Sequence, residues 1–142
     1  MKKTISILGI FILVITVSIS MLTKSPIEKY DFTDCQIGVL DYEGKEVLEF
    51  LNSTQAKEIV DSLMAMNIGG FGTKKYLYMQ GGGQSGYRVY LKSGDTIKIE
   101  TSHLPYIVIN SRGYKCNYED IKKLSTYQLE IMEKYYYSVN NQ

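Results

Sequence analysis

The fold is decided by residues 86–101, which read GYRVYLKSGDTIKIET. Apolar and polar side chains alternate on both sides of Ser93-Gly94-Asp95, which is the pattern of two β-strands joined by a tight turn. Successive side chains of a strand point to opposite faces of a sheet. We therefore expect the side chains on one face to point into the core, namely Val89, Leu91, Ile97 and Ile99. The opposite face then carries Arg88, Tyr90, Lys92 and Lys98.

Further strands are predicted on both sides of this hairpin. Residues 73–80 alternate in the same way and precede it after a glycine-rich loop, so the three runs predict an antiparallel meander. Residues 106–110 and 114–116 flank an Asn-Ser-Arg-Gly turn, and residues 36–40 and 45–50 flank an Asp-Tyr-Glu-Gly turn. Each pair predicts a hairpin, which brings the total to about five to seven short strands.

Two amphipathic helices are predicted to pack on this sheet. Asn52 is followed three residues later by Gln55, the pattern of a capping box, and apolar residues then recur at helical spacing until Gly69-Gly70. Residues 118–137 carry a second stripe of apolar side chains opposite a charged face. The order of strands and helices predicts an α+β domain with an antiparallel sheet.

An apolar segment precedes this domain. Residues 5–22 form a run of 18 residues without a charge. As a helix the run would be about 27 Å long, close to the thickness of the hydrocarbon core of a bilayer. We expect residues 1–23 to form a signal anchor with a single transmembrane helix, and residues 24–33 to form a tether. A small-x-small triplet ending at Ser20 leaves open cleavage near that residue and secretion of the domain.

Charge and composition indicate where the domain of residues 34–137 resides. Lys2 and Lys3 favour a cytoplasmic N-terminus, so we expect an extracytoplasmic domain, followed by a frayed tail at residues 138–142. The abundance of lysine over arginine is typical of bacteria with AT-rich genomes. A net charge of +1 argues against a nucleic-acid partner, and a hydrophobic content of 44% argues against a disordered chain.

No cofactor or metal is expected from the motifs. Gly81, Gly83 and Gly86 match the spacing G-x-G-x-x-G, but they lie between two predicted strands and open no helix that could bind a phosphate. His103 is the only histidine, and no pair of histidine or cysteine residues has the spacing of zinc ligands. We interpret the glycine-rich segment as a hairpin loop.

Two hypotheses concern the cysteines and the histidine. Cys35 and Cys116 lie near the two ends of the domain, so either a disulfide joins them or both are buried free thiols. His103 together with a cysteine or a carboxylate would supply the parts of a catalytic site. A small extracytoplasmic enzyme built around His103 is therefore the alternative function.

The leading hypothesis is a non-catalytic binding module of a bacterial cell envelope. Tyrosines interleaved with cations on one face of the meander offer stacking platforms and polar contacts for a protein or cell-wall partner. The residues of this predicted partner face are Tyr76, Tyr78, Arg88, Tyr90 and Lys92. The alternative is that a helix covers this face and makes its tyrosines part of the core.

A local likeness to a known family accompanies this hypothesis. The segment 87–99, YRVYLKSGDTIKI, follows a capped helix and resembles the helix-plus-hairpin units of PepSY-type extracytoplasmic modules. The resemblance covers about a third of the outer domain, and the additional strands and the terminal helix depart from that pattern. No residue is assigned a role from it.

Overall fold

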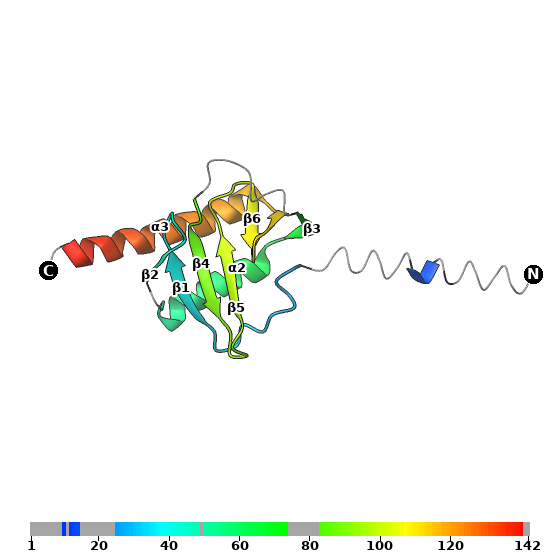
Figure 1. Cartoon of the computed structure of the whole chain (residues 1–142), viewed down its shortest axis with the longest axis horizontal. Coiled ribbons are helices and arrows are strands. Elements are labelled where there is room, and N and C mark those ends of the chain that lie inside the picture. Colours follow the sequence, from blue (N-terminus) through cyan, green and yellow to red (C-terminus); the bar gives the residue numbers. More distant parts are fainter. Residues whose placement is uncertain (1–9, 11, 15–24, 49, 74–82, 141–142) are drawn as a thin grey trace, which may run out of the picture.

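The computed structural model describes residues 10, 12–14, 25–48, 50–73 and 83–140. These residues form an α+β domain in which one antiparallel sheet is covered on one face by the helices α2 and α3 (Figure 1). The sequence predicts this class because runs of period two alternate with runs of helical period. The prediction of an α+β domain with an antiparallel sheet and two packed amphipathic helices is confirmed.

Among the described residues the sheet contains seven strands in the order β2-β1-β4-β5-β6-β7-β3, and all neighbours are antiparallel. The strands are β1 (Gln36–Leu40), β2 (Glu46–Leu48), β3 (Gly69–Thr73), β4 (Gly86–Tyr90), β5 (Thr96–Glu100), β6 (Tyr106–Ile109) and β7 (Arg112–Lys115). The hairpins β1–β2, β4–β5 and β6–β7 form where alternation and turn residues predict them. β4 also pairs with β1, so the first hairpin lies beside the central one.

Gly86, the last glycine of the G-x-G-x-x-G spacing, is the first residue of β4. Its role there is to allow close packing of two strands. A Cβ atom at this position would lie 1.9 Å from the carbonyl oxygen of Ile99 on β5. No side chain fits there, so glycine permits the close approach of β4 to β5. The glycine spacing that resembles a nucleotide loop therefore has a packing explanation at Gly86.

β3 differs from the prediction. Gly69-Gly70 was expected only to end the preceding helix, yet Gly69–Thr73 forms an edge strand that pairs with β7. A short glycine-rich run has no alternation that would reveal a strand, and β7 lies about 40 residues further along the chain. The prediction that residues 73–80 form the strand next to β4 in a meander is wrong, because β1 and β5 occupy the two sides of β4 and Thr73 pairs with β7 at the far edge of the sheet. Residues 74–80 themselves lie outside the described residues.

The helices begin where the sequence indicates. α2 (Ser53–Ala65) starts after a complete capping box, in which Gln55 N donates to Asn52 Oδ1 at 3.0 Å and Asn52 N donates to Gln55 Oε1 at 3.3 Å. α3 (Tyr118–Asn140) continues past the predicted end at Tyr137. The helical part of the chain therefore extends into the segment expected to be a frayed tail.

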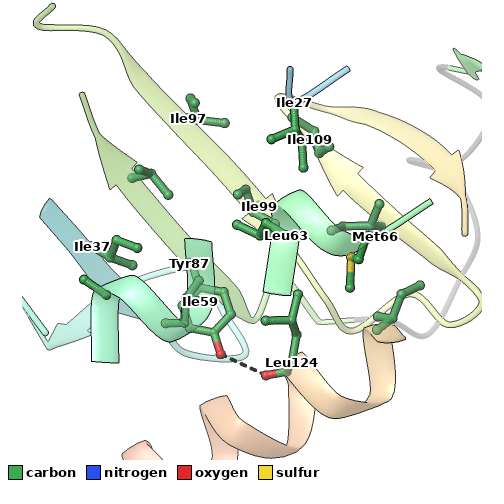
Figure 2. Close-up of a cluster of buried hydrophobic side chains, with 14 of the residues drawn as sticks. Ile27, Ile37, Ile59, Leu63, Met66, Tyr87, Ile97, Ile99, Ile109 and Leu124 are labelled. Atoms are coloured by element: carbon green, nitrogen blue, oxygen red, sulfur yellow. Dashed lines mark hydrogen bonds between the residues drawn. The ribbon is translucent and has the colours of Figure 1, made fainter. Parts of the chain in front are cut away.

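The core lies between the sheet and the two helices (Figure 2). Ile59 and Leu63 of α2 and Leu124 of α3 are each at most 2% exposed. They pack against strand residues that include Ile37, Tyr87, Val89, Ile97, Ile99 and Ile109. Alternation along β4 and β5 thus assigns the inward-facing residues as predicted.

Three buried hydrogen bonds fix α3 on the sheet. Tyr87, which is fully buried, donates its hydroxyl to the carbonyl oxygen of Leu124 at 2.8 Å (Figure 2). Gln128, 1% exposed, donates Nε2 to the carbonyl oxygen of Leu40 at 2.7 Å and accepts from Thr101 Oγ1 at 3.1 Å. Buried polar groups need such partners, so these bonds define the position of α3 along the sheet.

The segment expected to be a tether is packed against the domain. Ile27 is 1% exposed and belongs to the core cluster, and Tyr30 and Phe32 pack on its edge. The prediction of a free tether over residues 24–33 is therefore corrected, because the apolar side chains of this segment are buried. The folded part already includes Ser25, whose carbonyl accepts from Glu28 N at 3.2 Å.

The predicted membrane segment, residues 5–22, lies outside the described residues except for residues 10 and 12–14, which are helical. Among the residues that the structure does describe, no helix is both long enough and apolar enough to cross a bilayer. The signal anchor stays a prediction from the sequence.

Candidate partner-binding face

The two faces of the sheet carry different chemistry. We call open face the side opposite α2 and α3, defined by Glu46, Arg88, Tyr90, Lys98 and Glu100. Arg88 lies directly opposite Lys98 across the β4–β5 pair. Figure 1 shows β1, β4 and β5 in front of the two helices, so neither helix covers this side of the sheet. The alternative in which a helix buries the open face is not what the structure shows for the described residues.

Glu46 joins the two predicted face residues on β4. Its Oε2 atom lies 2.9 Å from Arg88 Nη1 and accepts a hydrogen bond from the Tyr90 hydroxyl at 2.7 Å. The Glu46 side chain is 14% exposed, so this pair is more shielded from water than a typical surface ion pair. Charge-assisted bonds to one carboxylate oxygen fix the orientation of both side chains.

The electrostatics of this cluster follow from these bonds. The hydrogen bond with Tyr90 is the main cause that raises the pKa of Arg88, and the carboxylate of Glu46 adds to it. The hydrogen bond to Glu46 raises the pKa of Tyr90, because the carboxylate favours the protonated phenol. Glu46 Oε1 is buried and has no hydrogen-bond partner among the described residues. Arg88 thus stays cationic and Tyr90 stays a neutral donor at neutral pH.

An aromatic pair borders the Glu46 cluster. Phe50 and Tyr90 meet edge to face, with ring centroids 5.9 Å apart and an interplanar angle of 75°. Phe50 is 48% exposed, so part of its ring is accessible. Aromatic side chains that are rigid and partly exposed beside polar groups are typical of recognition surfaces.

A second polar cluster lies further along β5. Glu100 accepts from Lys98 Nζ at 3.0 Å through Oε1 and contacts His103 Nε2 at 3.0 Å through Oε2. The side chains of Glu100 and His103 are 7% and 11% exposed. Lys98 Nζ also donates to Gln84 Oε1 at 2.6 Å. These bonds satisfy a largely buried carboxylate within the protein.

Three cations of the described part of this surface have carboxylate partners. Arg88 pairs with Glu46, Lys98 pairs with Glu100, and the exposed Lys92 lies 2.8 Å from Asp34 Oδ2. These three pairs carry no net charge. A surface that attracts a polyanion carries an excess of cations, which these three pairs do not supply.

The structure confirms part of the sequence-based placement. Arg88 and Tyr90 lie on the side predicted by alternation and share one carboxylate, whereas Lys92 lies in the turn after β4 and pairs with Asp34. Tyr76 and Tyr78 lie outside the described residues. The meander that predicted them next to β4 is not formed, because β1 and β5 are the neighbours of β4.

Sequence reasoning missed Glu46 and Phe50. They are 44 and 40 positions away from Tyr90, and only the pairing of β1 with both β2 and β4 brings them together. The sequence shows only that Glu46 lies in a predicted strand directly after a turn. That position does not indicate which side chains Glu46 contacts.

The two cysteines are free thiols. Cys35 precedes β1 and Cys116 follows β7, and three strands lie between β1 and β7. Four strand spacings amount to about 19 Å, whereas a disulfide needs Cα atoms within about 7 Å. Of the two alternatives from the sequence, the structure shows free thiols and not the bridge. Burial raises the pKa of Cys35, and it raises the pKa of Cys116 to about 11.

His103 contacts the carboxylate of Glu100. The alternative function requires His103 to lie beside a cysteine or a carboxylate. The 3.0 Å contact with Glu100 provides the carboxylate. Raised pKa values keep both thiols protonated near neutral pH, so neither is an activated nucleophile. Within the described ranges no group of three or more His, Cys, Asp and Glu side chains has the arrangement of a metal site.

The cavities of the described part lie elsewhere. A groove of about 710 Å³ runs between α2 and α3, with Leu124 and Tyr127 among its lining residues. A cleft of about 390 Å³ lies beside α3 and is lined in part by Tyr42, Leu129 and Tyr136. Neither of these two cavities has Arg88, Tyr90 or His103 among its lining residues.

Comparisons with known proteins give no assignment. No family model, no curated protein and no solved structure matches this chain. Function is therefore argued from the residues of the open face.

Proposed function

We propose that this chain is a membrane-anchored, extracytoplasmic, non-catalytic binding module of a bacterial cell envelope. In this proposal residues 5–22 span the membrane and the open face of the sheet meets a protein or cell-wall partner. The observation that carries the proposal is the preorganised cluster of Arg88 and Tyr90, both oriented by Glu46 and bordered by the exposed ring of Phe50.

Preorganisation matters because binding normally costs side-chain entropy. Arg88 and Tyr90 are already held by Glu46, so less rotamer freedom is lost when a partner arrives. Tyrosine and arginine are also the residue types that contribute most per side chain at interfaces. The cluster therefore has the composition and the rigidity of a recognition surface.

The pairing of charges narrows the chemistry of the partner. Arg88, Lys92 and Lys98 each have a carboxylate partner, so an anionic wall polymer would have to displace internal ion pairs. An uncharged polar surface, such as a polypeptide or a neutral glycan, can stack on the aromatic pair and bond to the exposed parts of the cluster. We place the partner in this class.

The contact of His103 with Glu100 favours a small enzyme as the second candidate. A carboxylate beside an imidazole is the arrangement of a general base with its orienting group. Both side chains are largely buried, however, and Glu100 already binds Lys98. A substrate has little access to this pair as it stands, and we rank the binding module first.

In-cell crosslinking of tagged full-length protein tests the proposal. The informative variant is the double substitution Arg88→Ala/Tyr90→Ala, and the matched control is Lys122→Ala/Lys123→Ala on α3. We expect the first to reduce recovery of a near-stoichiometric partner more than tenfold, because the loss of a single interface anchor already costs about 2 kcal/mol, or about thirtyfold in Kd. The control is expected to recover the partner like the wild type.

Equal recovery by both double variants would contradict the proposal. Loss of recovery in His103→Gln with no loss in the open-face variant would favour the second candidate. Circular dichroism of each purified variant verifies that it is folded before recovery is compared.

A further inference from the structure

The packed part of the chain begins very close to the predicted anchor. Ser25 accepts a hydrogen bond from Glu28 N at 3.2 Å, and Ile27 N donates to Ser25 Oγ at 3.4 Å. Ile27 itself is 1% exposed, in the core beside Ile109 (Figure 2). In the sequence, the apolar run ends at Leu22, so only two residues separate the anchor from the folded domain.

This short connection sets an upper limit on the height of the domain. Three Cα–Cα steps of a fully extended chain reach about 11 Å. The headgroup layer on each side of the hydrocarbon core is about 5 to 8 Å thick. Ser25 must therefore lie within or just above the headgroups, whereas a domain of this size has a radius of gyration of about 13 Å. The side of the domain around Ser25 has no room to stand clear of the bilayer.

The residues on this side are known from their contacts. Asn110 Nδ2 donates to the Tyr30 hydroxyl at 3.3 Å, which places the turn between β6 and β7 beside the N-terminal segment. Lys29 lies over the Tyr30 ring with Nζ 4.8 Å from the centroid, and the exposed Arg112 belongs to the same turn as Asn110. Tyrosine with flanking basic side chains is typical of the membrane interface.

We infer that residues 27–30 and the turn at residues 110–112 form a membrane-facing side that rests on phospholipid headgroups. This inference rests on the anchor in the proposed function. Lys29 and Arg112 contact headgroup phosphates, and Tyr30 lies at the level of the headgroups. The exposed carboxylates of Glu28 and Asp31 balance the two cations, so the contact is imposed by the short connection and persists on uncharged lipids.

The inference also restricts the position of the partner. The open face belongs to a domain held against the bilayer, so a partner must reach within about 30 Å of the membrane surface, roughly one domain diameter. In Figure 1 the C-terminal end of α3 lies at the opposite end of the molecule from the N-terminus. A membrane protein with an extracytoplasmic part satisfies this restriction directly.

Fluorescence quenching by lipids with a nitroxide on the headgroup tests the inference. The full-length chain is reconstituted into phosphatidylcholine vesicles, with and without phosphatidylglycerol, and carries a fluorescent amino acid in place of Ser111 or of Glu133 on α3. We expect strong quenching at position 111, little at position 133, and the same result in both lipid mixtures. A flexible Gly/Ser insert of about 20 residues between Lys24 and Ser25, which adds about 25 Å of reach, is expected to reduce quenching at position 111.

Three other outcomes would contradict the inference, and they distinguish its failure from the failure of the proposed anchor. Equal, weak quenching at both positions in protein that resists extraction by carbonate would overturn the inference and leave the anchor intact. Protein that carbonate releases from the vesicles would remove the anchor of the proposed function, and the inference with it. Quenching at position 111 that the insert does not reduce would show that the short connection does not impose the contact.

Discussion

The two faces of the sheet differ in what their side chains do. On the covered face Val89, Ile97 and Ile99 are at most 1% exposed and pack under α2 and α3. On the open face Arg88 and Tyr90 are partly exposed and bond to the carboxylate of Glu46. Neighbouring residues of one strand therefore differ in role: those on the covered face stabilise the fold, and we propose that those on the open face bind the partner. Substitutions on β4 and β5 should therefore affect either stability or partner binding, depending on the face.

The largest effect is expected from Ile99→Ala. Ile99 is fully buried, so the substitution removes buried methyl groups and leaves a cavity that costs about 2–5 kcal/mol of the free energy of unfolding. The matched control is Thr96→Ala, at an exposed site on the same strand, with an expected cost below about 0.5 kcal/mol. Urea unfolding of the full-length protein in mild detergent measures both. Equal costs would contradict the assignment of the covered face.

A pair of tyrosines on β4 gives the next largest effect and the sharpest contrast. Tyr87→Phe removes the hydroxyl that donates to Leu124, at a cost of about 0.5–1.5 kcal/mol in stability, and should leave partner recovery unchanged. Tyr90→Ala should reduce partner recovery more than tenfold, and it also costs stability because it removes the hydrogen bond to Glu46 and the ring contact with Phe50. Unfolding and crosslinking of the same two proteins check this. The reverse pattern would show that the two faces are wrongly assigned.

Alkaline pH should lower stability through Tyr127, which lies between the helices and not on the open face. Desolvation, followed by the hydrogen bond to Glu58, raises the pKa of Tyr127 from 10.0 to about 12. The unfolded chain then loses the phenolic proton first, so the stabilising contribution is full below pH 10 and is lost as pH rises toward 12. We expect Tyr127→Phe to show a smaller loss of stability over this range in unfolding experiments at several pH values. An identical pH dependence of the two proteins would refute the role of Tyr127.

The smallest effect is expected from Lys92→Ala. The side chains of Lys92 and Asp34 are 72% and 68% exposed, so water and salt screen their ion pair. The unfolding midpoint should match that of the wild type at low and at high salt. A clear loss at low salt that disappears at high salt would show that this pair contributes more than its exposure implies.

Local patterns predicted the elements that local interactions determine. The alternation around Ser93-Gly94-Asp95 predicted β4 and β5, and the pairing of Asn52 with Gln55 predicted the start of α2. Arg88 and Tyr90 were placed on the correct side of the sheet by the same alternation. These features depend on neighbours within a few residues.

Features that depend on distant pairing could not be predicted in this way. β3 pairs with β7, Ile27 fills the core beside Ile109, and Glu46 reaches β4 through β1. Each contact joins segments about 40 or more residues apart, so no local period reports it. The sequence predicted Arg88 and Tyr90 as residues of the candidate site. It did not predict Glu46, whose carboxylate orients both of them.

The central claim is that the open face meets the partner. Its most direct test is photo-crosslinking in cells from a benzoylphenylalanine in place of Phe50, which borders the Glu46 cluster and is 48% exposed. The same amino acid in place of Lys123 on α3 is the control. We predict a crosslinked product of higher mass from position 50 and none from position 123. A product from position 123 with none from position 50 would contradict the account.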